Sequence, residues 1–289
     1  MGRLDVEKLP YEDYSNRQLA VVPLAVLGVA ILIIFGHFLL TGTPVALGLD
    51  FTGGTEIRIE AADTSSSELE EEFAAIEPET VRSIVGAGDT YIITAPPEAD
   101  RDEIETIAEE SGYSVESVES RSPAFGSDAQ FQALLGVAFA FIGMSILVAL
   151  MFRTFVPSIA VVASAFSDIM IPLALMNVFS IELTLGAVAA LLMIIGYSVD
   201  SDILLNNHVL KRHGTFYESA YRAMRTGVSM TLTSIAAMST MFVVAWALGI
   251  PLLDDIALIL VFGLTADLMN TYLLNMSLLR WYKYEGVKR

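Results

Sequence analysis

The sequence predicts an α-helical membrane protein with six transmembrane helices and one inserted α+β domain in water, on three observations. Hydrophobic residues make up 54% of the 289 residues and charged residues only 17%, whereas a soluble domain carries about 25% charged residues. Six segments are long and apolar enough to cross the roughly 30 Å hydrocarbon core of a bilayer. The net charge of −18 is concentrated in residues 43–128, which hold 21 acidic and 4 basic residues.

The six expected spans are joined by short connections, except that the acidic stretch follows the first. That first span is too long and too far from the N-terminus for a typical signal peptide, and it has no Ala-x-Ala-like cleavage site, so we expect it to be retained. The expected spans are Leu19–Leu40, Gln130–Phe152, Val156–Phe179, Leu183–Leu205, Thr226–Leu248 and Leu252–Leu279.

Lysine and arginine residues beside the spans predict the orientation, because they favour the cytoplasmic side. The short loops Ser180–Glu182 and Gly249–Pro251 contain none, so we expect both termini in the cytoplasm of a multi-pass cell-membrane protein. The expected basic side carries Arg3, Lys8, Arg17, Arg153, Lys211, Arg212, Arg222, Arg225, Arg280, Lys283, Lys288 and Arg289. The expected organisation is a cytoplasmic segment 1–18, span 19–40, a mostly extracytoplasmic domain with linkers at 41–129, spans two to six at 130–279 with a cytoplasmic loop at 206–225, and a cytoplasmic tail 280–289.

The acidic stretch predicts a small α+β domain of the ferredoxin-like plan, with elements in the order β-α-β-β-α-β. Gly86-Ala87-Gly88-Asp89 has the composition of a hairpin turn, and Asp100 is the expected N-cap of the second helix. No Asp-x-Asp-x-Asp-Gly calcium pattern occurs, so we expect a solvated acidic surface, which suits a halophilic source, on a domain that binds another polypeptide. The expected elements are Thr55–Glu60, Ser66–Ile76, Thr80–Val85, Thr90–Thr94, Arg101–Ser111 and Tyr113–Glu119.

Ionisable side chains inside the predicted spans are the candidates for function, because each is costly in a bilayer. Helical spacing puts Asp267, Asn270, Thr271 and Asn275 on one stripe. The rise per residue puts Asp200, Asp202, Arg225 and Asp267 at a similar depth in the membrane, so we expect Arg225 beside the acids. We expect a hydrated seam between the last three spans that relays protons or cations. The alternatives are a static buried ion pair with hydrogen-bonded carboxylates, or an Asp202 that only snorkels to the interface. The charged candidates are Asp168, Asp200, Asp202, Arg225 and Asp267.

The segment between the fourth and fifth spans contains a helix-start pattern. Thr215 and Glu218 fit the capping box Ser/Thr-x-x-Glu. We therefore expect a short amphipathic helix, Phe216–Met224, that lies on the inner membrane surface.

Two glycine-containing motifs give the sequence a family resemblance. Gly48–Thr55 (GLDFTGGT) and Ala190–Asp202 (ALLMIIGYSVDSD) resemble SecF, an accessory membrane subunit of the Sec protein-translocation machinery that is related to the RND transporter superfamily. Arg225-Thr226 looks like the family's fifth-span motif, and Phe166-Ser167-Asp168 resembles its third-span His-Asp motif with Ser in place of His. The resemblance implies an RND-like half, with motif residues Gly48, Asp50, Phe51, Gly53, Gly54, Gly196, Tyr197 and Ser198.

The resemblance also implies partners and a mechanism. The partners are SecD, the SecY-centred channel, the translocating polypeptide and the lipid bilayer. In bacterial members, proton flow through intramembrane acids is thought to drive the external domain, and by position the candidates here are Asp200, Asp202 and Arg225. The acidic position of the bacterial motif is occupied by Ser201, so the proton site has moved or been lost. This variant resembles the archaeal branch, and the acidic domain suggests a haloarchaeal member.

Other function classes fit less well. A proton-coupled RND-type exporter half would need to capture lipids or small molecules with an external domain of only about 85 residues. An intramembrane aspartyl protease would use Asp200 and Asp267 to activate water, but the usual Gly-x-Gly-Asp context is missing. The chain has no cysteine for a thiolate metal site or nucleophile, and its negative charge argues against a nucleic-acid partner. We expect no enzyme activity, cofactor or metal.

Overall fold

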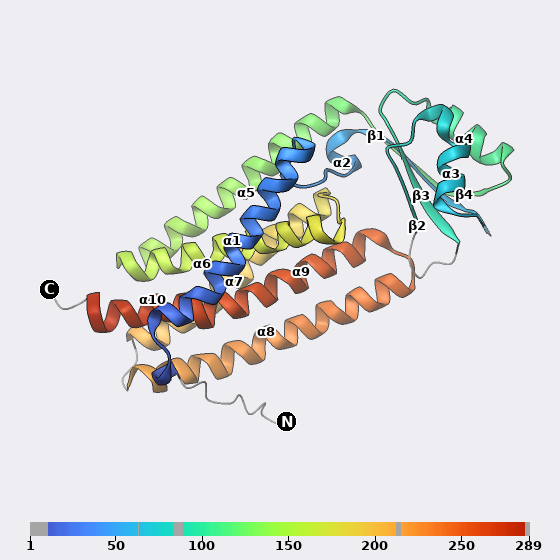
Figure 1. Ribbon diagram of the computed structural model, residues 1–289. Coiled ribbons are helices and arrows are strands. Elements are labelled where there is room, and N and C mark those ends of the chain that lie inside the picture. Colours follow the sequence, from blue (N-terminus) through green and yellow to red (C-terminus); the bar gives the residue numbers. More distant parts are fainter. Residues whose placement is uncertain (1–10, 63, 84–88, 212–214, 287–289) are drawn as a thin grey trace.

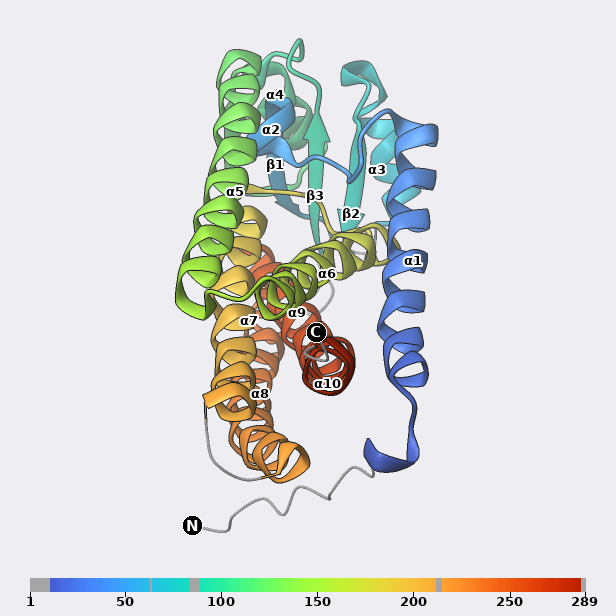
Figure 2. The ribbon, with the colours of Figure 1, turned by 90° about the vertical axis from the view of Figure 1, so that its left-hand side faces the viewer.

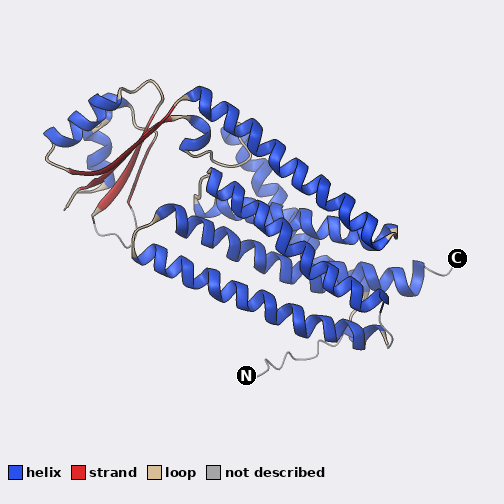
Figure 3. Cartoon of the chain, turned by 180° about the vertical axis from the view of Figure 1, so that it is seen from behind, coloured by secondary structure: helices blue, strands red, loops and turns tan. Residues whose placement is uncertain are grey.

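The computed structural model describes residues 11–62, 64–83, 89–211 and 215–286. The long helices form one bundle, and the small sheet lies at one end of it together with two short helices (Figures 1 and 3). The end of the last helix and the beginning of the first long helix both lie at the opposite end of the bundle from the sheet (Figure 1).

Five of the described helices are long and apolar enough to cross a membrane. The last long helix, α9, carries three acidic residues and continues without a break through a π-helical segment into α10. The bounds are α1 Asn16–Thr41, α5 Pro123–Phe152, α6 Phe155–Phe179, α7 Leu185–Lys211, α8 Phe216–Ala247, α9 Pro251–Met269, the π-helix Asn270–Asn275, α10 Met276–Trp281 and a π-helical end Tyr282–Gly286. A short 3-10 turn, Tyr11–Asp13, precedes α1.

Helix α6 lies in the middle of the bundle, between α1 and α5 in the end-on view (Figure 2). It packs against α1, α5, α7 and α9, and α9 in turn packs against α7 and α8. The buried share of the spans reflects this arrangement, since more than half of α6 is buried, whereas α5 and α8 are mostly exposed. Apolar side chains that are exposed here suit contact with lipid.

Local capping explains where the helices begin. Ser15 and Gln18 form a capping box at α1, and Ser122 caps α5 with Pro123 in its first turn. Helix α5 therefore begins before the expected Gln130, because its N-terminal turns lie outside the apolar window.

The expected surface helix Phe216–Met224 is wrong as a separate element. Thr215 caps it as predicted, by accepting a hydrogen bond from the Glu218 N–H, but the helix runs on without a break as α8. Phe216, Ala220 and Met224 are buried in a cluster inside the bundle. The apolar face of this segment packs against protein, so it does not lie on the membrane surface.

The described residues of the predicted external domain form one four-stranded antiparallel sheet in the order β2-β3-β1-β4. Its two longer helices follow β1 and β3, which gives the predicted β-α-β-β-α-β order, and Asp100 caps the second one as expected. The bounds are α2 Leu49–Thr52, β1 Gly54–Glu60, α3 Ser66–Glu72, a 3-10 turn Ala74–Ile76, β2 Thr80–Ser83, β3 Thr90–Ala95, α4 Arg101–Glu110 and β4 Ser114–Arg121. Most of the predicted turn Gly86–Asp89 lies outside the described residues.

The core of this domain forms where one face of the sheet meets its helices. Strand β1 pairs Ile57 with Ile93 of β3 and with Val118 of β4. Phe73 and Ile104, from the helical side, are fully buried against them. Because side chains alternate across a strand, the acidic residues of β1 and β4 fall on the other face and at the edges.

Candidate functional site: a buried carboxyl network

A network of buried polar side chains lies where α6, α7 and the last helix meet. Asp168 of α6 accepts hydrogen bonds from Ser198 of α7 at 2.5 Å and from the amide of Asn270 at 2.6 Å. All three side chains are fully buried. Asp168 thus joins three helices at one point, as its position in the third predicted span suggested.

The second half of the network contains two further aspartates. The Asp267 carboxyl accepts a hydrogen bond from Ser201 at 2.7 Å, and the Asp202 carboxyl accepts one from Asn275 at 2.7 Å. The Thr271 hydroxyl lies between the two carboxyls, 2.8 Å from Asp202 Oδ1 and 3.2 Å from Asp267 Oδ1. One hydroxyl therefore links two acidic groups that come from different helices.

The π-helical turn brings the amides of the last helix onto the network. Asn270 and Asn275 are five residues apart, a spacing that would turn their side chains well away from each other in an α-helix. In a π-helix the hydrogen bonds run from i to i+5, so residues five apart lie near the same face. Asn270 therefore reaches Asp168 while Asn275 reaches Asp202.

The charge of these carboxyl groups is not compensated by any residue that the structure describes. Asp168 and Asp202 are fully buried and Asp267 is 2% exposed, yet none of them forms a salt bridge within the described part of the chain. Asp202 Oδ2 has no hydrogen-bond partner there either. An unpaired ionised carboxylate in such surroundings is strongly disfavoured. The arrangement suits carboxyl groups that carry a proton.

Two of the predicted site residues lie outside this network. Asp200 is exposed and lines a cavity of about 510 Å³ between α7, α8 and α9, which Ser201 and Asp267 also line. Arg225 is half-buried in α8 and makes no salt bridge with any residue that the structure describes. Similar depth in the membrane predicted that Arg225 meets the acids, but depth does not fix the direction in which a side chain leaves its helix.

The sequence analysis did not predict the part that Ser201 takes in the network. Ser201 occupies the acidic position of the bacterial motif, and its hydroxyl donates to Asp267 and lies 3.1 Å from the Thr271 hydroxyl. Asn206, one turn beyond Asp202, is fully buried and neither of its amide atoms has a partner in the described chain. The spacing of Ser198, Asp202 and Asn206 was the signal, because i and i+4 positions share one helix face.

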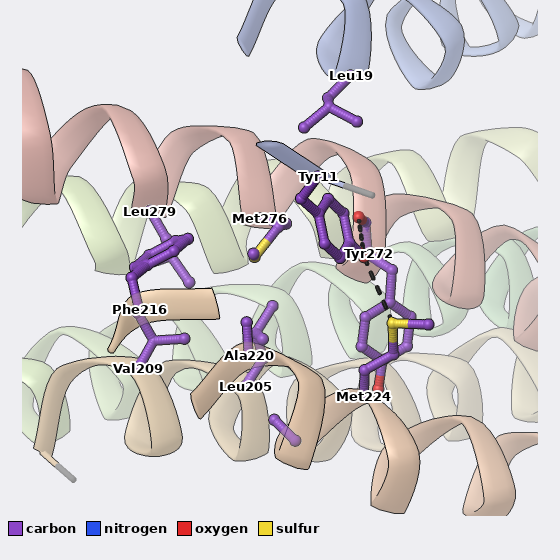
Figure 4. Packing of buried hydrophobic residues seen from close by; sticks show 11 residues of the cluster. Tyr11, Leu19, Leu205, Val209, Phe216, Ala220, Met224, Tyr272, Met276 and Leu279 are labelled. Atoms are coloured by element: carbon purple, nitrogen blue, oxygen red, sulfur yellow. Dashed lines mark hydrogen bonds between the residues drawn. The ribbon is translucent and has the colours of Figure 1, made fainter. Parts of the chain in front are cut away.

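An apolar cluster lies where the starts of α1 and α8 meet α7 and the last helix (Figure 4). Tyr11 points into it between Tyr272, Met276 and Met224, and its hydroxyl bonds the Tyr272 carbonyl oxygen at 3.1 Å. Burial raises the pKa of Tyr11, so this hydroxyl stays neutral. Arg280 of α10 fixes the same segment by donating to the carbonyl oxygens of Tyr11 and Tyr14.

Both predicted glycine motifs are associated with α7. Residues Gly48–Gly54 lie beside the N-terminus of α7, where Asp50 accepts a hydrogen bond from the Leu185 N–H, and Ala190–Asp202 lies within the helix. In the second motif, Ser198 belongs to the network, Tyr197 lines the cavity and Gly196 is exposed. Both motifs thus concern the same helix.

Two family models match the chain. The model described as protein export membrane protein SecD/SecF, C-terminal, matches residues 103–285, and the SecD/SecF GG motif model matches residues 38–64. The chain belongs to the SecD/SecF family. Its curated relatives are named protein-export membrane protein SecF, and the chain is 60% identical to that of Haloferax volcanii and 59% identical to that of Haloquadratum walsbyi, each over the full length of both chains. The SecF of Pyrococcus furiosus is 38% identical over 95% of this chain and 94% of its own.

A solved structure shows the same fold. The crystal structure of SecDF from Thermus thermophilus matches with a TM-score of 0.76 at 20% identity, covering 98% of this chain and 40% of that chain. SecDF in a second, super-membrane-facing form matches with a TM-score of 0.62 at 21% identity over 40% of that chain. The SecF relatives confirm the predicted resemblance, its archaeal type and its haloarchaeal character. They and the apolar helices show a multi-pass membrane protein.

Proposed function

We propose that this chain is the SecF-like subunit of the Sec protein-export machinery and that its buried carboxyl network takes up and releases protons as polypeptides are exported. The export role is supported by full-length identity of about 60% to SecF proteins. The proton role is supported by one observation, the cluster of Asp168, Asp202 and Asp267 in a bundle interior without a compensating cation in the described chain.

The hydroxyl groups of the network supply a short path for a proton. A threonine hydroxyl has one hydrogen to donate and two lone pairs that accept. Thr271 therefore donates to only one of Asp202 and Asp267 at a time, and the other carboxyl satisfies the contact only if it carries its own proton. Moving the proton from one acid to the other reverses the direction of both hydrogen bonds, while Thr271 keeps the last helix in contact with Asp202 of α7.

The cavity beside the network is the proposed entrance. It is lined by Asp200, Asn207 and His208 as well as by Ser201 and Asp267. Asp200 then attracts cations to the entrance, while the buried acids bind the proton. This division of labour accounts for two aspartates two residues apart on one helix.

The relay predicts a specific role for Thr271. Replacing Thr271 with valine removes the hydroxyl and keeps the shape, so we expect slow export and normal amounts of protein. Thr271→Ser keeps the hydroxyl and should retain most of the export rate. Pulse-chase labelling of a secreted protein measures both, and equal export in the wild type and Thr271→Val would contradict the relay.

The remaining features of the proposal concern topology. We propose six spans, with the α9 to α10 segment as the sixth, both termini in the cytoplasm and residues 41–129 mostly outside as a ferredoxin-like domain. The sheet order β2-β3-β1-β4 supports that plan. The helix bounds shift the predicted division, because α1 begins at Asn16 and α5 at Pro123. The expected loop at 206–225 is wrong for its described residues, since 206–211 belong to α7 and 216–225 to α8. The match to the SecDF crystal structure covers 40% of that chain, which suits a subunit that corresponds to part of SecDF.

The proposed partners are a SecD chain and, through it, the SecY-centred channel with its translocating polypeptide in the bilayer. Family models shared by SecD and SecF support the first of these. The test is purification of the tagged chain from its own membranes in mild detergent, together with pulse-chase export in a strain that lacks it. We expect SecD and channel subunits to co-purify and export to slow. Recovery of the chain alone with unchanged export would contradict the proposal and favour an RND-type exporter.

A further inference from the structure

We propose that residues 44–54, here called the joint, fasten the external domain to the outer end of α7 so that the two move as one body, with Asp50 as the positioning residue. The inference rests on the proposed function, because α7 carries Ser198, Ser201 and Asp202 of the network in its middle turns. A displacement of α7 that follows protonation would then reach the sheet directly. The joint contains the first glycine motif, whose role the network does not explain.

Asp50 connects three elements at one carboxyl group. Its Oδ2 accepts a hydrogen bond from the Leu185 N–H at 3.0 Å, in the first turn of α7. Its Oδ1 lies 3.8 Å from Nε of Arg121, the last residue of β4. Asp50 itself belongs to α2, which ends at Gly53 and leads at once into β1. A carboxylate is also favoured at a helix N-terminus by the helix dipole.

The backbone of the joint pairs with the loop that leads into α7. Leu47 and Leu183 form a parallel bridge, in which the Gly48 N–H bonds the Leu183 carbonyl at 2.9 Å and the Leu183 N–H bonds the Ala46 carbonyl at 2.7 Å. Asn177 of α6 donates to the Pro44 carbonyl at 2.9 Å. These contacts fix the joint to the α6–α7 connection without relying on a single side chain.

Phe51 fixes the joint to the start of α5 as well. Its side chain is 2% exposed and packs with Ala129 of α5 and Val188 of α7. The Gln130 amide donates to the Phe51 carbonyl at 2.8 Å. A Cβ at Gly126 would lie 2.6 Å from the same carbonyl oxygen, so the two backbones are in direct contact.

Another contact between the external domain and the bundle is weaker. Arg82 of β2 pairs with Glu182 at 3.4 Å, with 39% of the arginine side chain exposed. Exposed ion pairs contribute little to stability, because water screens the charges. The joint, with buried and backbone contacts, is therefore the stiffer of the two connections and transmits motion, whereas the Arg82 pair can open without disturbing α7.

A reversible disulfide tests whether the joint moves as one body. The chain has no cysteine, so Leu47→Cys/Leu183→Cys provides one pair at the bridge, where neighbouring strands lie about 4.8 Å apart. We expect the oxidised, cross-linked protein to export as well as the reduced one. Loss of export on oxidation that a reductant reverses would show that the two segments must separate, and would overturn the proposal. The single variants Leu47→Cys and Leu183→Cys control for the oxidant.

A distance measurement tests Asp50 without any export assay. Spin labels at Glu109→Cys on α4 and Leu248→Cys beyond α8 are both exposed, and pulsed electron resonance gives the distribution of distances between them. We expect Asp50→Ala to broaden this distribution, Asp50→Asn to restore much of its sharpness because an amide oxygen still accepts from Leu185, and Arg82→Gln to have a smaller effect than Asp50→Ala. An unchanged distribution in Asp50→Ala, or an equal broadening in Arg82→Gln, would overturn the role of Asp50.

The two arms also separate this proposal from the proposed function. If the chain does not act in export, deletion leaves export unchanged while the distance distributions still report on the joint. If export depends on the chain but the joint is not the connection, oxidation of the double cysteine variant stops export, or Asp50→Ala leaves the distance distribution unchanged.

Discussion

Asp202→Asn is expected to reduce export to the level of a strain without the protein, while the chain remains abundant and assembled. An asparagine keeps an oxygen that accepts from Thr271 and Asn275, as Asp202 Oδ1 does, so the packing should survive. It cannot bind and release a proton, so the exchange with Asp267 stops. Pulse-chase export and co-purification with SecD measure the two properties separately.

Asp200→Asn is the matched control for this change. Asp200 lies two residues away on the same helix, carries the same charge and is exposed in the cavity. We expect Asp200→Asn to retain most of the export rate, with a stronger dependence of that rate on the proton concentration. An equal loss of export in the two variants would mean that the total charge of α7 matters. Normal export in Asp202→Asn would remove Asp202 from the relay.

Alanine at Gly53 or Gly54 should cost about 3 kcal/mol of stability at each position. Gly53 has φ 73° and ψ −179°, a region that essentially only glycine occupies, and a Cβ there would lie 2.8 Å from the Pro123 nitrogen. At Gly54, φ is 119° and a Cβ would lie 2.4 Å from the Ala95 carbonyl oxygen. The added Cβ would meet backbone atoms of β3 and of the start of α5. Moving these backbone segments away would disturb the sheet and the helix, so the clash is not easily relieved.

Thermal unfolding of the detergent-solubilised protein measures this loss. Gly136→Ala is the control, because a Cβ at that position of α5 meets no atom within 4 Å. We expect the control to unfold at the wild-type temperature and both joint variants to unfold at clearly lower ones. Wild-type stability in Gly53→Ala and Gly54→Ala would mean that the turn relaxes into another conformation.

Hydropathy predicted five of the long helices, and spacing predicted the polar stripe of the last helix, because both depend on local pattern. The end of α6 and the start of α7 agree with the sequence within a few residues, and Asp267, Asn270, Thr271 and Asn275 all reach the network. The boundaries of α5 and α8 were less predictable. Their additional turns contain polar residues and depend on caps at Ser122 and Thr215 rather than on hydropathy.

The sequence did not predict which residues of neighbouring helices contact each other. A helical pattern shows which residues share a face, but it does not show towards which neighbour that face turns. Arg225 was expected beside the acids and lies apart from them, while Asp168 and Ser198 meet across α6 and α7. The π-helical turn also changes the register of the last helix by part of a turn, and the residues Asn270–Asn275 carry no sequence pattern that announces it.

All the side chains that the network joins come from α6, α7 and the last helix of one polypeptide. All the hydrogen-bonded acids are therefore encoded together, and the network forms without a side chain from another subunit. Fusion of this chain to a partner, or separation from one, would leave every one of these bonds intact. This self-sufficiency makes it understandable that the same fold spans the full length of the haloarchaeal SecF relatives and 40% of the longer SecDF chain of Thermus thermophilus.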